Sequence, residues 1–165
     1  MIGILNKNKD KINEEVLKNI NYVLLVLLSP DNSTEDGKEI SRGLIGILTD
    51  KQKLLNKDAC MYLCSVILNL LEQDITNDDI RQLMQDIVAL LTKPECLPKV
   101  NDDNVFGLLR YVINEINDNI ENNKHNNELE QAQKEMQNII NSIQKIITAG
   151  EEQNKQQQQD KYEQE

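Results

Sequence analysis

The chain has 165 residues, of which 39% are hydrophobic and only 3% aromatic, and its formal net charge is −10. This length fits one ordinary domain with an aliphatic core. The charge argues against a nucleic-acid-binding protein, because contact with phosphates needs clustered Lys and Arg, and also against binding to an anionic membrane surface. Six Gly, three Pro and no alternating apolar run argue against a β fold.

The longest uninterrupted apolar run, residues 23–28, is far shorter than the ~20 residues of a membrane-spanning helix. The first residues show no secretory signal. Three cysteines, an odd number, do not make a disulfide framework. If Met1 is the native start, we therefore expect an intracellular protein without a transmembrane segment. If the chain is a fragment, an extracellular origin stays open.

Two amphipathic helices are predicted in the first part of the chain. The first spans residues 10–29 and ends at Pro30, and a polar loop follows as far as Gly37. Its apolar stripe consists of Ile12, Val16, Ile20, Val23, Leu24 and Leu27. The second helix spans residues 38–49 and contains Gly43 and Gly46. Since Gly costs about 1 kcal/mol against Ala within a helix, either a neighbouring element packs closely there or the helix is weak, and we favour close packing.

Residues 58–91 predict a helical hairpin, the central element of the chain. Apolar residues recur at three-and-four spacing in both of its arms. They are Cys60, Cys64, Ile67, Leu68 and Leu71, and then Ile80, Leu83, Met84, Ile87, Val88 and Leu91. Thr76 is the expected N-cap of the second arm, and Asp78 and Asp79 suit its first turn.

Two further helices are predicted after a proline-containing segment, residues 92–103. The first spans residues 104–121, with Asp102 or Asp103 as its cap. The second spans residues 128–148 and resembles a coiled-coil helix, because its narrow apolar stripe is nearly heptad. This stripe, the candidate partner-binding site, consists of Leu129, Met136, Ile139, Ile143 and Ile147, with Ala132 on the same face. It could lie on the rest of the domain or pair with a partner.

The Gln-rich segment 150–165 has one Tyr and no other large apolar side chain. It cannot offset its ordering entropy by burial, so we predict a disordered tail unless a partner holds it. The domain then comprises residues 10–149.

Residues 22–48 and 64–91 share one scheme, an apolar run that ends in Leu-Leu, a polar turn and a second apolar run. They begin about forty residues apart, within the range of paired-helix repeats. The predicted fold is therefore all-α, with about six helices in stacked antiparallel hairpins. A short solenoid of the HEAT/ARM type and a closed helical bundle both stay open.

No constellation of residues predicts chemistry. Cys60 and Cys64 lie one turn apart on an apolar face and suit small buried hydrophobes, while zinc-ligand spacing to Cys96 or His125 is absent. A single His in an Asn-rich loop suits a solvent-exposed side chain. The acidic pairs 78–79 and 102–103 stand where helices start, which capping explains. We therefore predict no catalytic residue, no cofactor and no metal site.

Several segments together resemble a known kind of domain. They are VLLVLLSPDNST, SRGLIGIL, LCSVILNLL with ITNDDIRQLMQDIVALL, and IINSIQKIITAGE, which cover most of residues 12–151. The pattern resembles the helical subdomain that lies beside the autoproteolytic β-domain in egg-jelly-receptor and polycystin-type (GAIN-like) ectodomains. The resemblance implies a purely structural role within a larger protein. It carries over no functional residue, because the cleavage site of that family lies in its β-domain.

The favoured function is a non-catalytic helical scaffold or adaptor, a protein–protein interaction subunit of a larger assembly. Its partners would be other protein subunits, recognised through a helix face, with the acidic surface setting partner choice. One alternative is the helical subdomain of an extracellular receptor-type protein. Another is a small enzyme or a lipid-binding helical module. The oligomeric state is left open.

Overall fold

The computed structural model describes residues 1–164, and within that range it is all-α, as predicted, with no strand. Short 3₁₀ turns join some of the helices, at Lys9–Lys11, Gln52–Leu54 and Asn127–Leu129. The α-helices are α1 (Ile2–Lys7), α2 (Glu14–Leu27), α3 (Glu35–Asp50), α4 (Lys57–Leu71), α5 (Asp78–Leu91), α6 (Leu97–Val100), α7 (Asp103–Asn123) and α8 (Glu130–Glu163).

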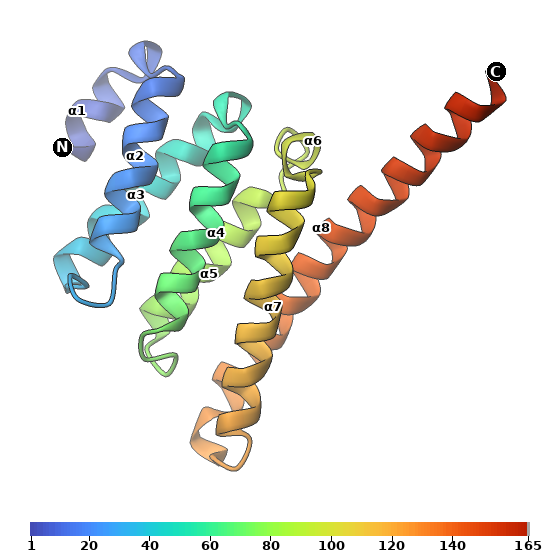
Figure 1. The fold of residues 1–165 in the computed structure, drawn as a ribbon. Coiled ribbons are helices and arrows are strands. Elements are labelled where there is room, and N and C mark those ends of the chain that lie inside the picture. Colours follow the sequence, from blue (N-terminus) through green and yellow to red (C-terminus); the bar gives the residue numbers. More distant parts are fainter. Residues whose placement is uncertain (165) are drawn as a thin grey trace.

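Three antiparallel hairpins, α2–α3, α4–α5 and α7–α8, stack in chain order (Figure 1). The first helices α2, α4 and α7 form one layer, in which α4 packs between the other two. The second helices α3, α5 and α8 form the other layer, with α5 in the middle. Because each hairpin packs against the next along the chain, the fold is an open stack of paired helices, the geometry of a short solenoid.

Short polar side chains begin helices α2, α3, α4, α5 and α7. At each of these N-caps the side-chain oxygen accepts hydrogen bonds from backbone N–H groups in the first turn, which would otherwise have no partner. These caps are Asn13, Thr34, Asn56, Asn77 and Asp102. Asp102 was a predicted cap. The prediction of Thr76 is wrong, because its hydroxyl bonds Asp74 Oδ1 at 2.7 Å and the next residue, Asn77, caps α5.

The core is continuous and aliphatic, and it is densest around α4. This helix is covered by α2 and α7 on either side and by α5 behind it. Six of its side chains are therefore completely buried: Cys60, Leu63, Cys64, Val66, Ile67 and Leu70. The predicted hairpin 58–91 is thus the central element of the fold.

Helix α1, which the sequence does not predict, covers the outer side of α3. Its Ile2 side chain lies 3.0 Å from the position that a Cβ on Gly43 would take. The expected close approach is therefore confirmed at Gly43. It is wrong at Gly46, where nothing lies within 4 Å of such a Cβ.

Gly46→Ala is expected to raise the free energy of unfolding by about 0.5–1 kcal/mol, because alanine fits the open helical position and restricts the unfolded chain. Urea unfolding followed by circular dichroism measures the gain. Gly43→Ala is the matched control and should show no gain, since its methyl group would press on Ile2. Equal effects at the two positions would contradict this account.

Arg81 is a buried charged residue that ties α5 to α8. Its side chain is 6% exposed, and its guanidinium forms ion pairs with Asp78 and Glu135. Its Nη1 also donates to the Ile75 carbonyl at 2.8 Å. Each of the three guanidinium nitrogens therefore donates to an acceptor, and these bonds offset the cost of burying the charge. Burial disfavours the charged form, but the two carboxylates outweigh it and raise the pKa of Arg81.

The predicted disorder of the tail is wrong for residues 150–163, because α8 continues to Glu163; Glu165 lies outside the described residues. Gln, Glu and Lys are good helix formers, and the extension of an existing helix needs no new nucleus. Asn154 also exchanges two amide hydrogen bonds with Asn101, both 3.0 Å long. Beyond this pair the helix projects from the stack with exposed side chains (Figure 1).

Candidate partner-binding groove

The apolar stripe that was predicted to bind a partner is buried inside the chain itself. All five of its residues are at most 8% exposed: Leu129, Met136, Ile139, Ile143 and Ile147. Helix α8 packs this face on α5 and α7. Assignment of these residues to a partner-binding site is thus wrong for this fold, and any docking surface must lie elsewhere.

The three cysteines are free and buried. Burial raises the pKa of Cys60 and of Cys64 to about 12, and it raises that of Cys96 as well. A thiol with so high a pKa stays protonated at neutral pH and is a poor nucleophile. This confirms the interpretation of Cys60 and Cys64 as small core side chains.

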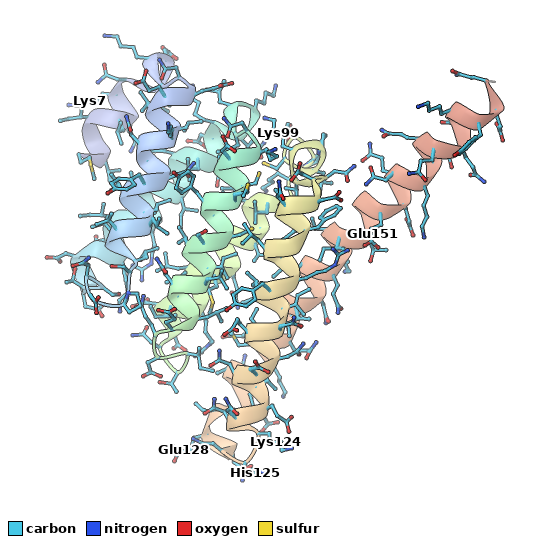
Figure 2. The ribbon with its side chains drawn as sticks, in the orientation of Figure 1. Lys7, Lys99, Lys124, His125, Glu128 and Glu151 are labelled. Carbon is cyan, nitrogen blue, oxygen red and sulfur yellow. The ribbon has the colours of Figure 1, made fainter. Side chains whose placement is uncertain are left out.

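The other polar residues considered as chemistry lie at helix ends. His125 is exposed at the turn between α7 and α8, next to Lys124 and Glu128 (Figure 2). Asp78 and Asp79 are in the first turn of α5, where they form ion pairs with Arg81 and Arg42. Among residues 1–164, no group of three or more His, Cys, Asp or Glu side chains is placed to hold a metal ion.

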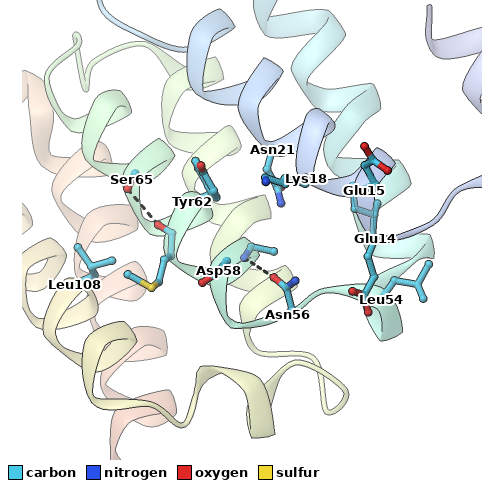
Figure 3. A pocket seen from close by; sticks show the side chains of 13 residues that line it. Glu14, Glu15, Lys18, Asn21, Leu54, Asn56, Asp58, Tyr62, Ser65 and Leu108 are labelled. Carbon is cyan, nitrogen blue, oxygen red and sulfur yellow. Dashed lines mark hydrogen bonds between the residues drawn. The ribbon is translucent and has the colours of Figure 1, made fainter.

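A groove of about 860 Å³ crosses the layer of α2, α4 and α7 (Figure 3). Helix α2 supplies residues spaced by one helical turn, and α4 does the same on the opposite side. Their lining side chains are Glu14, Glu15, Leu17, Lys18 and Asn21 from α2, and Asp58, Ala59, Met61, Tyr62 and Ser65 from α4. Leu54 and Asn56, from the segment before α4, and Leu108 of α7 complete it.

Asn21 stands out among these residues because it is 1% exposed and forms no side-chain hydrogen bond. Neither its Oδ1 nor its Nδ2 has a partner within the described part of the chain. It lies in the gap between α2 and α4, with Lys18 beside it and Tyr62 across the groove (Figure 3). A buried amide without partners costs about 1–3 kcal/mol, so the fold carries an unmet hydrogen-bonding group here.

Sequence reasoning missed this residue, although a signal was present. Position 21 lies on the buried face of α2, where its helical neighbours Leu17, Ile20 and Leu24 are apolar. An Asn on such a face is a polar interruption in a core stripe. The pattern locates the position, but only the fold shows that its amide is left without a partner.

The rim of the groove is acidic. Its charged lining residues are three carboxylates, from Glu14, Glu15 and Asp58, and one cation, Lys18. None of the four takes part in an ion pair within residues 1–164. The three carboxylates thus have no salt-bridge partner and outnumber the one cation, which favours a positively charged molecule at this edge.

The same layer carries exposed aromatic side chains. Tyr22 of α2 is 60% exposed and Tyr111 of α7 is 52% exposed, while Tyr62 of α4 lines the groove. The negative field extends over this part too, because the carboxylates of Glu115 and, more weakly, Glu72 raise the pKa of Tyr111. Tyrosine is a frequent anchor in protein interfaces, where it offers a large apolar ring and a polar tip.

Comparison with protein-family models, curated proteins and solved structures finds no match to this chain. The resemblance to GAIN-like ectodomains therefore stays a prediction. Within the part of the chain that the structure describes, no helix combines the length and the apolar character needed to cross a membrane.

Proposed function

We propose that this protein is a non-catalytic helical scaffold that binds another protein through the layer of α2, α4 and α7. The observation that carries the proposal is the groove across this layer, with its unpartnered amide and acidic rim. A stack of paired helices suits this role, since it presents a broad surface built from successive repeats.

The groove has the mixed character of an interface. Met61, Tyr62 and Leu108 supply apolar and aromatic surface that is only partly buried. Around them lie charged side chains, as in the polar rim of a typical protein interface. We place its partners among proteins, and the acidic rim would act mainly on partner choice and association rate.

We further propose an intracellular location. Its support is that Cys60, Cys64 and Cys96 are free thiols buried in the core, an arrangement typical of reducing compartments.

The test is quantitative affinity purification from source cells, with two matched double variants as comparisons. The groove variant, Met61→Glu with Leu108→Glu, places carboxylates on the proposed surface. The control variant, Gln82→Glu with Ala89→Glu, adds the same two charges to exposed positions on α5, in the other layer. Circular dichroism first verifies that both variants keep the helical fold.

We expect a fixed set of proteins with the wild type and the control variant, and at least a tenfold loss of that set with the groove variant. Equal recovery from all three baits would show that the groove is not the docking surface. If each bait is recovered without any other protein, the result would contradict the scaffold function.

A further inference from the structure

We propose that the groove between α2 and α4 binds an extended peptide segment that carries a lysine or arginine, and that Asn21 hydrogen-bonds its main chain. This inference rests on the proposed function and deepens it by naming the class of ligand. Its basis is the amide of Asn21, which is buried, unpartnered and set in the groove.

The hydrogen-bonding groups of the Asn21 amide match those of a peptide main chain. Asn21 presents one acceptor, Oδ1, and one donor group, Nδ2, within a single plane. A peptide unit presents the complementary N–H and C=O groups. In an extended chain the N–H and C=O groups of one residue point to the same side, so this N–H could donate to Oδ1 while this C=O accepts from Nδ2.

The same argument selects an extended segment. The N–H and C=O groups within a helix already bond one another, so a docked helix offers only side chains. An extended chain keeps its main-chain groups free, as peptides that add to a sheet edge do. The ligand would therefore lie along the groove with its backbone toward α2.

Two neighbours of Asn21 must move when the peptide enters. The Asn21 amide is shielded from solvent, and the exposed Lys18 and the partly buried Tyr62 flank it. No hydrogen bond within residues 1–164 holds the Lys18 ammonium or the Tyr62 hydroxyl in place. In the proposed complex these two long side chains take other rotamers, so that the main chain of the peptide can reach the amide.

The rim specifies the charge of the ligand. Carboxylates of Glu14, Glu15 and Asp58 line the groove without ion-pair partners, and one lysine opposes them. A basic side chain of the ligand would meet these carboxylates, and its aliphatic stem would lie on Met61 or Tyr62. A ring such as that of Tyr62 also attracts a cation over its face.

The test begins with a random 12-residue peptide library displayed on phage and selected on the full-length protein. Selected peptides are synthesised and titrated by fluorescence anisotropy against the wild type and three variants. These variants are Asn21→Leu, the rim variant Glu14→Gln with Asp58→Asn, and the groove variant Met61→Glu with Leu108→Glu. The same peptides are also made with single N-methyl groups along the backbone, each of which removes one N–H donor.

We expect selected peptides rich in Lys or Arg, whose affinity falls at least tenfold with Asn21→Leu and falls with the rim variant and with added salt. Asn21→Leu should also raise the melting temperature by roughly 5 °C, because it removes an unsatisfied buried amide. N-methylation at one peptide position should weaken binding to the wild type tenfold. The same N-methyl group should not weaken binding to the Asn21→Leu variant, because the contact that it removes is already absent there.

Several outcomes would overturn the inference. If no peptide is selected, or if Asn21→Leu and every N-methylated peptide leave affinity unchanged, Asn21 does not bind a main chain. If the groove variant abolishes binding while Asn21→Leu does not, the proposed docking surface stands and only this inference fails. If neither variant reduces binding, both proposals fail.

Discussion

Replacement of Leu63 by alanine is expected to lower the free energy of unfolding by about 2–5 kcal/mol, the range of buried leucine-to-alanine changes. Leu63 is completely buried on α4, the helix that packs between α2 and α7. The loss combines the transfer free energy of the deleted methyl groups with the cost of the cavity that they leave. Since α4 joins the first hairpin to the third, the damage should reach both interfaces of the stack.

Urea unfolding, followed by circular dichroism, checks this expectation, with Leu68→Ala as the matched control. Leu68 lies on the same helix but is only partly buried, so the same chemical change should cost clearly less. The midpoint should fall for Leu63→Ala without a change in slope if the stack unfolds as one unit. Equal losses at the two positions would contradict the burial that the structure assigns to α4.

Gly150→Ala is expected to destabilise the protein by about 1–3 kcal/mol, the cost of overpacking a tight contact. An added Cβ would overlap the ring of Phe106, which is itself buried, and would lie 3.1 Å from Asn101 Oδ1. Alanine is otherwise the better helix former by about 1 kcal/mol. The sign of the change in the free energy of unfolding therefore reports whether α8 packs closely on the Phe106 ring.

The comparison with Gly46→Ala makes this test specific. Both glycines lie inside helices, but an added methyl group meets nothing at Gly46 and a buried ring at Gly150. The same substitution should then stabilise at the first position and destabilise at the second, measured under identical urea conditions. A gain in stability at both would mean that α8 does not follow the course described here.

Local signals were sufficient to predict most of the helices. The predicted hairpin 58–91 matches α4 and α5 to within a residue at its outer ends, because apolar periodicity and capping are properties of short sequence windows. Helix α1 was not predicted, because its own sequence carries no such local signal. It has six residues and no side-chain cap, and its packing on α3 stabilises it.

The candidate site was less predictable than the fold. Periodicity in α8 showed that a face is buried, but it could not show whether α5 and α7 or another protein cover it. The lack of apolar residues in the tail predicts disorder, but the helix propensity of its Gln and Glu residues and its continuity with α8 favour the helix that the structure shows. Asn21 required the tertiary structure, since the absence of a partner for its amide depends on α2 and α4 together.

The position of the groove on the seam between the first two hairpins has a mechanical consequence. A stack of hairpins bends chiefly at the joints between neighbouring hairpins, because each hairpin contacts only its immediate neighbours. A peptide seated between α2 and α4 would hold this joint at one angle, and it would also touch Leu108 of α7, at the edge of the joint between α4 and α7. Occupancy of one small groove would thereby set the curvature of part of the stack, and with it the angle at which the projecting end of α8 is held.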